Sequence, residues 1–512
     1  MSTIHLNLHH RICLIGLLVV AMASLPLAAY ATDAPPSATN MTPAPAATAS
    51  PEPTNTPTDS PSSVPQGLAG CKNDHQNVDY PLAVDCTLPA TDSCPPPENV
   101  DTSVPCNSNP SDLNGNIRTY RDNSAHFKIS DIVIHDTEGK GPEDGLINAA
   151  LSEFQQPKNS VSIHYIVGRD GTVYQVLREK DIAYHAGNLW YNEHSIGIEH
   201  TGYEGSGFNS YTPAMYAASA KLVAYLTDKY DIPVDHAHIV SHGTIPSPYF
   251  AVGPNHLDPG PYFNFSAYFN SIDSPAPLPM KNVVTVENKK TSLQASEQPT
   301  DCNFFYLYNS PSTASEKFAI RENTESESDM SGSDAKIKSD LECAKPSTNP
   351  HDTRTFSVSN NVEAEMSYYY LNKKVDQAGS GNTMYEIWYA TNTAPKGPFH
   401  TQLAWIAVPP GQAIEGEADR GAKVISVSGS DKASTARIFG RPTSANPSAY
   451  ETPLPQGTDS YQLGDAPNGA TFVSAYSIPE DVGGKLWYEI NYNHRQAWVP
   501  AEEVTVKEVC SG

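Results

Sequence analysis

The sequence predicts an α/β domain, a mixed β-sheet flanked by helices, followed by two small all-β barrels. Between residues 120 and 273, short apolar runs typical of buried strands alternate with stretches whose apolar residues recur at helical spacing. After Met280 the chain consists of short, aromatic, strand-like segments separated by turn residues. Strands that alternate with helices and include a hairpin favour a mixed sheet wrapped by helices.

The elements of the first region follow from local signals. Arg169-Asp170-Gly171 lies between two apolar runs and predicts a tight hairpin turn. Thr212 followed by Pro213 predicts a helix start, because threonine caps the first turn and proline is tolerated at the first helical position. In chain order we expect a strand at 131–134, a helix at 144–154, hairpin strands at 162–167 and 173–177, a strand at 194–199, a helix from 212, and a short strand at 239–240 that ends at His242.

Composition divides the 512-residue chain into segments. Residues 1–31 have the basic start, apolar stretch and small-x-small ending of an export signal, and an uncleaved membrane anchor is the alternative. Residues 32–70 are mostly Pro, Ala, Thr and Ser, which indicates a linker. The other expected segments are a cysteine-containing, loop-rich segment at 71–119, the α/β domain at 120–273, a linker at 274–284 and two β-repeats at 285–412 and 421–508.

The leader and the charge set expectations for location and partners. No stretch after the leader is apolar enough to span a bilayer, so we expect a secreted protein without a stable membrane anchor. The formal charge of −25 argues against a nucleic-acid partner, whose phosphates attract basic surfaces.

The cysteines are consistent with an oxidising compartment. Seven of the eight lie after the leader, so disulfides are expected, with one thiol left over. Four of them, at positions 71, 86, 94 and 106, can form two bridges, and Cys302 can pair with Cys343, but spacing does not fix the connectivity. The alternative for the cluster of four, a metal site, is disfavoured because paired C-x-x-C elements are missing.

A weak internal repeat runs through the C-terminal region. Residues 385–387 (Tyr-Glu-Ile) and 404–406 (Ala-Trp-Ile) correspond to residues 488–490 (Tyr-Glu-Ile) and 497–499 (Ala-Trp-Val). Upstream, residues 307–311 correspond to residues 438–442. This pattern predicts two copies of one small barrel. The tryptophans of the repeats either fill the two cores or form a ligand-binding face, and the sequence leaves both possibilities open.

Three residues form a candidate metal site in the α/β domain. His135 and His242 each end a predicted strand, and Asp258 lies in the loop that follows His242. Two imidazoles and a carboxylate leave a fourth zinc position open, as in catalytic rather than structural sites. Such a site is suited to amide hydrolysis, because zinc acidifies water and polarises a carbonyl. Among 17 histidines this spacing alone is a weak signal.

The local sequences strengthen this hypothesis, because they resemble the type 2 family of N-acetylmuramoyl-L-alanine amidases, which includes phage T7 lysozyme and the peptidoglycan-recognition proteins. Five blocks occur in the family's order over about 150 residues. They are 132–139 (IVIHDTEG), 161–171 with VSIHY and RDG, 184–187 (YHAG), 195–199 (SIGIE) and 256–261 (HLDPGP). The resemblance implies a zinc amidase fold and one Zn²⁺ ion per chain.

Carried over position by position, the resemblance assigns roles to individual residues. His135, His242 and Asp258 become the zinc ligands, and Glu199 becomes the general base. His256 takes the place where many relatives have a lysine that stabilises the oxyanion, and this departure makes that role dependent on protonation. The residues expected in the substrate groove, with packing as the alternative for the last three, are Asp136, Tyr184, His185 and Trp190.

The other histidines are expected to be structural. His164 faces a strand interior, which favours a packed core histidine over a ligand. His200, His236 and His238 are expected to be ordinary surface or turn residues.

The function implied is that of a secreted zinc amidase that cuts peptidoglycan between N-acetylmuramic acid and L-alanine. The alternative is a peptidoglycan-binding recognition protein without catalysis, but such relatives typically lack a zinc ligand, whereas all three ligands and the glutamate are present here. The C-terminal repeats resemble bacterial SH3-like modules, which often help hydrolases to hold cell walls.

Overall fold

The computed structural model of the chain separates into two units, residues 1–59 and 60–512. The first unit lies outside the residues that the structure describes, as do the predicted leader, the linker at 32–70 and Cys94, Cys106, Cys302 and Cys343. No helix among the described residues is long and apolar enough to cross a membrane. The structure describes residues 71–72, 78–88, 120–122, 128–139, 141–154, 161–203, 210–246, 256, 258–260, 262–272, 276–288, 304–315, 361–391, 399–419, 421–428, 435–443, 462–475 and 480–507.

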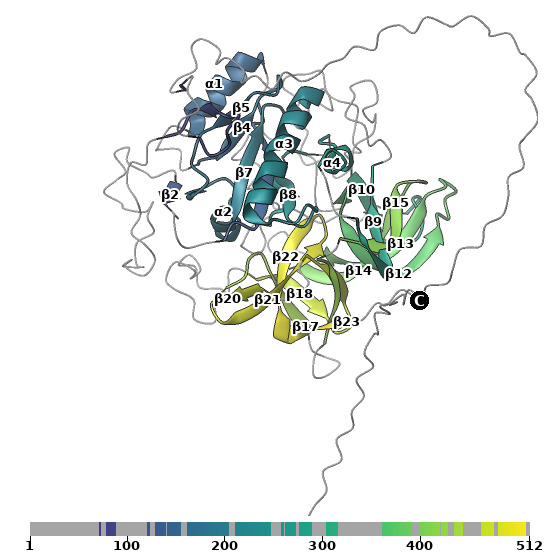
Figure 1. Cartoon of the computed structure of the whole chain (residues 1–512). Coiled ribbons are helices and arrows are strands. Elements are labelled where there is room, and N and C mark those ends of the chain that lie inside the picture. The colour runs from purple at the N-terminus through teal and green to yellow at the C-terminus, as the bar shows by residue number, and fades with distance from the viewer. Residues whose placement is uncertain are drawn as a thin grey trace, which may run out of the picture. The chain divides into compact units, whose positions relative to one another are not determined.

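A six-stranded mixed sheet forms the first region (Figure 1), as the sequence predicts. Its strand order is β1-β5-β4-β7-β3-β8, and every neighbouring pair is parallel except the β4–β5 hairpin. The strands are β1 (Val84–Asp85), β3 (Asp131–Asp136), β4 (Tyr165–Val167), β5 (Val173–Gln175), β7 (Ser195–His200) and β8 (Ile239–Ser241). A separate pair joins β2 (Tyr120–Asp122) to β6 (Asp181–Ala183).

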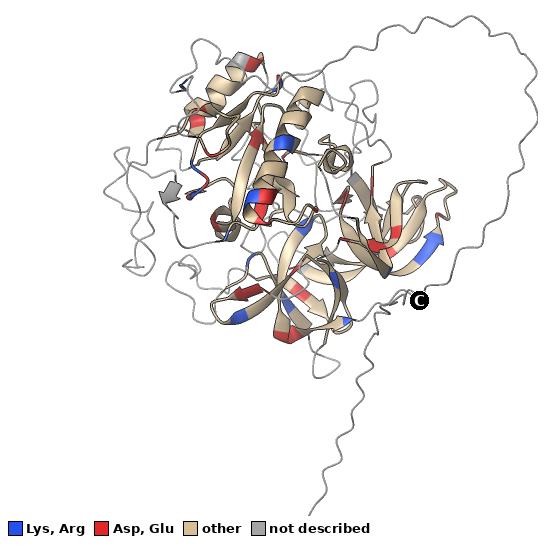
Figure 2. Ribbon diagram, in the orientation of Figure 1, with Lys and Arg blue, Asp and Glu red and all other residues tan. Residues whose placement is uncertain are grey.

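Helix α3 (Pro213–Tyr230) covers one face of this sheet (Figure 1). It begins where the sequence predicts, with the Thr212 hydroxyl accepting a hydrogen bond from Met215 N. Its apolar side packs against the isoleucines of β3 and β7, and α4 (Phe265–Phe269) extends the same core. The charged residues of α3 lie on its outer side, whereas the central strands are largely apolar (Figure 2).

Two different elements cover the opposite face. Helix α1 (Glu143–Phe154) packs on the part formed by β1, β4 and β5. The part near β3 and β8 is covered by residues of the C-terminal region: Phe439, Trp487 and Trp498 share one apolar cluster with Val133 and Val240. Parallel strands require cover on both faces. The C-terminal region therefore completes the core of the α/β domain.

The N-terminal cysteine-containing segment is part of the same sheet. Its strand β1 pairs in parallel with β5, and a disulfide joins Cys71 to Cys86. Asp79 receives hydrogen bonds from the guanidinium of Arg178 at 2.8 and 2.9 Å, and the pKa of Asp79 is lowered, because these and other hydrogen bonds outweigh the effect of burial. Two of the four clustered cysteines, Cys71 and Cys86, thus form one of the expected disulfides.

The C-terminal region contains two copies of one antiparallel pairing pattern. In the first copy β9 pairs with β12 and β15, β12 with β13, β13 with β14, and β14 with β10. In the second copy β16 pairs with β19 and β23, β19 with β21, β21 with β22, and β22 with β17. The first copy comprises β9 (Leu278–Val286), β10 (Phe304–Tyr308), β11 (Asn361–Glu363), β12 (Ser367–Val375), β13 (Thr383–Thr391), β14 (Phe399–Val408) and β15 (Ala413–Ala418). The second comprises β16 (Lys423–Val427), β17 (Thr435–Phe439), β18 (Gln462–Pro467), β19 (Thr471–Ser474), β20 (Glu480–Val482), β21 (Lys485–Tyr492), β22 (Arg495–Pro500) and β23 (Val504–Lys507).

The repeated sequence blocks occupy equivalent positions in these copies. Glu386 stands opposite Trp405 in the first copy, and Glu489 stands opposite Trp498 in the second. A parallel pair between β14 and β18 joins the two copies. Strand β9 begins inside the segment expected to be a linker, 274–284, and β15 lies beyond the expected end of the first repeat at 412. Pro279 is accommodated in β9, where it stands opposite Glu417.

Buried polar contacts join the two regions as well. The Tyr191 hydroxyl donates to the Glu489 carboxylate, and Asn188 Nδ2 donates to Gly440 O at 2.9 Å. His236 Nε2 lies 3.2 Å from the Glu363 carboxylate, with both side chains buried. Such groups are costly to bury unless they are paired, so the contacts favour one specific docking geometry.

The surface expectation for three histidines was wrong. His200 is completely buried at the end of β7, with its two ring nitrogens beside His135 O and the Ser219 hydroxyl. His236 and His238 do lie in a turn, as expected, but both are buried. His236 faces Glu363 of the C-terminal region, and His238 pairs with Asp235 of the same turn.

The interface makes a prediction about stability. Trp498 is completely buried, with its ring 5.3 Å from that of Trp190, so Trp498→Ala should lower the free energy of unfolding by about 3–5 kcal/mol. Urea unfolding measures this loss. Leu486→Ala is the control, because Leu486 lies on the neighbouring strand but is 46% exposed, and it should cost no more than about 0.5 kcal/mol. Equal stability of the two variants would contradict the buried interface.

Candidate metal centre and active site

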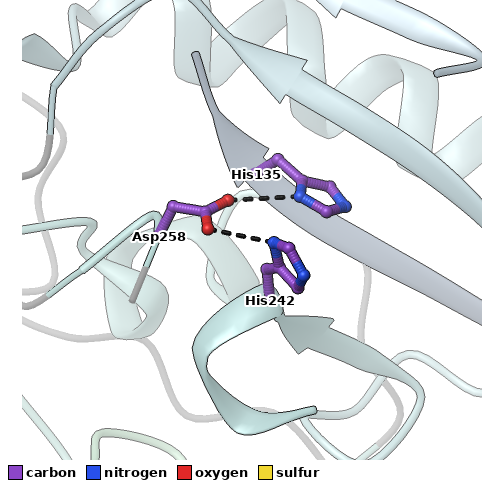
Figure 3. Close-up of side chains that lie close together, drawn as sticks. All are labelled: His135, His242 and Asp258. Carbon is purple, nitrogen blue, oxygen red and sulfur yellow. Dashed lines mark hydrogen bonds and ion pairs between the residues drawn. The ribbon is translucent and has the colours of Figure 1, made fainter. Parts of the chain in front are cut away.

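The three predicted ligands meet at the carboxyl ends of adjacent parallel strands. His135 is near the end of β3, His242 begins the 3₁₀ turn (His242–Thr244) that follows β8, and Asp258 lies in the loop beyond. Asp258 Oδ2 is 3.1 Å from His135 Nδ1, and Asp258 Oδ1 is 3.0 Å from His242 Nδ1 (Figure 3). All three side chains are at most 3% exposed.

The arrangement of these donors fits a divalent cation. Both Nδ1 atoms and both Asp258 oxygens face one another, and neither ring nitrogen of His242 has an aligned hydrogen-bond partner among the described residues. Buried polar atoms left in this state normally have a further ligand. Burial, the largest influence, lowers the pKa of His242 to about 3, which keeps its imidazole neutral and able to bind a metal.

Glu199 stands directly beside the metal ligands. It is the register partner of His135 on β7, and its side chain is buried, with Oε2 lacking a hydrogen-bond partner in the described part of the chain. Burial and then the Asp258 charge raise the pKa of Glu199 well above its usual value. Asp136 and Glu138 add further negative charge. A bound cation would offset this repulsion among carboxylates.

His256 lies at the rim of the same site. Its ring stacks on that of His242 at 4.4 Å, and its Nδ1 is 3.3 Å from Asp258 Oδ1. Burial lowers its pKa, but the hydrogen bond and charge of Asp258 outweigh burial and raise it overall. With 38% of its side chain exposed, His256 can face a bound substrate. The structure thus places Glu199 and His256 beside the three candidate ligands.

Glu138 is a member of the site that the sequence analysis missed. Its carboxylate is 3.9 Å from His256 Nδ1, and with His256 and Asp258 it forms a second group whose donor atoms lie within 4.8 Å of one another. Burial and the Asp258 charge raise the pKa of Glu138 to about 7. Its position three residues after His135 was the available sequence signal.

His185, expected in the substrate groove or in packing, lies against the candidate ligand His135. Its Nδ1 is 2.9 Å from His135 Nε2, on the side of the His135 ring opposite Asp258. Its Nε2 is 3.2 Å from the Ser195 hydroxyl. Gly197 makes this placement possible, because a Cβ atom at Gly197 would lie only 2.7 Å from His185 Cγ. His185 therefore packs directly against the candidate ligand His135.

Two other groove expectations are corrected by burial. Asp136 is 3% exposed and already accepts hydrogen bonds from Glu138 N at 2.8 Å and the Tyr211 hydroxyl at 2.5 Å. Trp190 is 8% exposed and packs between His194 and Trp498. The burial of both side chains favours packing over substrate contact. Tyr184 is partly exposed, and its contact with substrate stays a prediction.

His164 has the structural role that its position predicted. It is 1% exposed, its Nε2 lies 2.9 Å from Asp181 O, and its Nδ1 accepts a hydrogen bond from Gly197 N. Burial lowers its pKa to about 4. His164 is thus a neutral histidine that holds β7 in place.

Known proteins resemble the segment that contains this site. The sequence profile of the N-acetylmuramoyl-L-alanine amidase family matches residues 125–261. N-acetylmuramoyl-L-alanine amidase A of Achromobacter lyticus is 30% identical over 167 residues, which cover 29% of this chain and 86% of that protein. The 1,6-anhydro-N-acetylmuramyl-L-alanine amidase AmpD of Haemophilus influenzae is 30% identical over 139 residues, 26% of this chain and 69% of that protein.

Among solved structures, N-acetylmuramoyl-L-alanine amidase LysC from Clostridium intestinale URNW matches with 22% identity and a TM-score of 0.23, covering 30% of this chain and 91% of that one.

The close approach of Gly197 and His185 yields a test of the site's packing. In Gly197→Ala the new methyl group would collide with His185 and with Ile163, at 2.6 Å from its Cδ1, so we expect a loss of about 1–3 kcal/mol in unfolding free energy. Urea unfolding measures this. Gly145→Ala in α1 is the matched control, because the added methyl meets Pro142 at an ordinary 3.7 Å and alanine favours the helix. A Gly197→Ala protein as stable as Gly145→Ala would rule out the tight packing described.

Proposed function

Because the chain belongs to the N-acetylmuramoyl-L-alanine amidase family and is an enzyme with that activity, we propose that it is a zinc-dependent hydrolase of peptidoglycan. The bond cleaved is the amide between N-acetylmuramic acid and the first L-alanine of the stem peptide. The observation that carries the proposal is the convergence of His135, His242 and Asp258 beside Glu199, inside the segment that the family profile matches.

In this proposal His135, His242 and Asp258 hold one Zn²⁺ ion. Two imidazoles and a carboxylate are the donor set of catalytic zinc sites, which keep a further position free. When bound there, zinc supplies Lewis-acid chemistry, which polarises the substrate carbonyl and acidifies water. The burial of all three ligands keeps solvent from competing for them.

The side chains around the ligands supply proton transfer and charge stabilisation. Glu199 accepts a proton from the attacking water, whose oxygen adds to the amide carbonyl carbon. The C–N bond then breaks, and Glu199 returns the proton to the departing L-alanine nitrogen. His256, partly exposed at the rim, donates a hydrogen bond to the oxygen that becomes negatively charged.

We further propose that the two C-terminal copies are SH3-like barrels. Five equivalent antiparallel pairings in each copy support this, together with the equivalent positions of Trp405 and Trp498. In the second copy the face that carries Trp498 packs on the α/β domain and is buried there.

We also propose that the protein works outside the cytoplasm. The export signal expected at 1–31 and the disulfide between Cys71 and Cys86 support this location, since structural disulfides persist in oxidising compartments. Peptidoglycan, the proposed substrate, lies in such a compartment.

Product analysis tests the reaction and its dependence on zinc. Purified peptidoglycan treated with the protein should yield free L-alanine amino ends and intact N-acetylmuramic acid, identified by mass spectrometry. Metal analysis should find about one zinc per chain. His242→Ala should lose both zinc and product, whereas His400→Ala, at an exposed β14 position, should retain both. Full zinc and full activity in His242→Ala would refute the ligand assignment, and peptidoglycan binding without new ends would favour the recognition-protein alternative.

A second prediction separates metal binding from catalysis. Glu199→Gln should keep its zinc but lose activity by about a hundredfold to ten-thousandfold, because an amide cannot accept the proton of the attacking water. The measurement is the turnover number on soluble muropeptides, with zinc content determined on the same sample. Activity within about threefold of the wild-type value would remove Glu199 from the mechanism.

A further inference from the structure

We propose that Ser195 and His185 are positioning residues that fix which nitrogen of His135 carries a proton, so that His135 presents a bare Nδ1 to the metal. The inference rests on the metal site proposed above. It follows from an unbroken row of short contacts behind His135: His135 Nε2 to His185 Nδ1 at 2.9 Å, His185 Nε2 to Ser195 Oγ at 3.2 Å, and Ser195 Oγ to the backbone oxygen of Tyr191.

The end of this row determines the direction of every hydrogen bond in it. A backbone carbonyl oxygen can only accept, so the Ser195 hydroxyl must donate to Tyr191 O. A hydroxyl has one hydrogen, so Ser195 Oγ can interact with His185 only as an acceptor. His185 therefore carries its proton on Nε2.

The same reasoning determines which nitrogen of His135 carries its proton. A neutral imidazole with a proton on Nε2 has a bare Nδ1, and His185 Nδ1 must accept from His135 Nε2. His135 therefore keeps its proton on Nε2, and its Nδ1, which faces Asp258, is the nitrogen free to bind a metal. A ligating histidine usually donates its second N–H to a carboxylate, carbonyl or water. Here a second histidine takes that place.

The opposite direction is disfavoured by the structure. If Ser195 donated to His185 Nε2, its oxygen would face the Tyr191 carbonyl oxygen at hydrogen-bond distance with no hydrogen between them. His185 would then protonate on Nδ1 and present this N–H to His135 Nε2. The proton of a neutral His135 would be left on Nδ1, where it blocks the metal.

Both positioning residues are held firmly by their surroundings. Backbone N–H groups of His185 and Ala186 donate to Asn192 Oδ1 at 3.0 and 2.8 Å, which fixes the segment that carries His185. Tyr191, whose carbonyl ends the row, is anchored through its hydroxyl to Glu489 of the second β-repeat. The docking of the C-terminal region thus fixes the group that sets the direction.

Nitrogen NMR of the metal-free protein tests the direction of the row. In protein labelled with ¹⁵N-histidine, long-range ¹H–¹⁵N spectra distinguish a protonated ring nitrogen from a bare one, and the signals of His185 are those missing in His185→Asn. We expect His185 to be protonated on Nε2 alone. Ser195→Ala should abolish this preference, because it removes the acceptor. Protonation of His185 on Nδ1, or an unchanged spectrum in Ser195→Ala, would overturn the proposal.

Zinc affinity tests the consequence, measured by competition with a chromophoric chelator. His185→Leu should bind zinc about tenfold to a hundredfold more weakly than the wild type, as is typical when an outer-shell partner of a metal ligand is lost. His185→Asn, whose amide oxygen can replace Nδ1 as acceptor, should recover most of this loss. Thermal unfolding of the metal-free variants shows whether each is folded, and if His185→Leu is not, Ser195→Ala takes its place and should also weaken binding.

The outcomes separate this inference from the function on which it rests. A wild-type protein that binds no zinc would refute the metal site and the inference with it. A wild-type protein that binds zinc, with His185→Leu folded and equally tight, would refute only the role of His185. Weak binding in His185→Leu that His185→Asn does not restore would show that packing, and not the hydrogen bond, supports His135.

Discussion

The organisation of this protein depends on one constraint: a largely parallel sheet has to be covered on both faces. Helix α3 covers one face completely enough to bury the isoleucines of β3 and β7, but α1 reaches only the β1, β4 and β5 part of the other. The second β-repeat covers the remainder with Phe439, Trp487 and Trp498. The strand that carries His135 is therefore buried between two regions of the chain that are far apart in sequence.

The site combines strong charge repulsion with extensive hydrogen bonding. Burial and then the Asp258 charge raise the pKa values of Asp136, Glu138 and Glu199. The neighbouring histidines lower the pKa of Asp258 despite its burial. An arrangement of this kind is stable when a cation is shared by the carboxylates or when protons are held between them. On the other side of His135 the contacts are uncharged. The candidate ligand His135 therefore has charged carboxylate groups on one side and uncharged hydrogen-bonding groups on the other.

Residues with local signals were predictable, and residues defined by distant partners were not. The strand before His135, the capped start of α3 and the turn at Arg169-Asp170-Gly171 follow from adjacent residues, and the amidase motifs placed the ligands and Glu199. Trp190 looks like a groove residue until Trp498, more than 300 positions later, covers it. His236 looks like a surface residue in the sequence, but it is buried against Glu363 of the first repeat. The sequence placed His185 near the site, but the direction of its hydrogen bonds depends on its contact with Ser195. In the sequence motif Ser195 looks like an ordinary strand residue.

The bond between Tyr191 and Glu489 joins residues 298 positions apart, and this separation affects the order of folding. A growing chain forms its near contacts first, because closing a long loop costs entropy that only later contacts repay. Helices α1 and α3 lie close in sequence to most of the strands that they cover, whereas the aromatic cover over β3 and β8 comes only from β17, β21 and β22. Without these strands Trp190, Tyr191 and Val240 would lose their apolar cover, and exposed apolar surface of this kind promotes aggregation. The C-terminal strands are therefore expected to complete the core of the α/β domain late in folding.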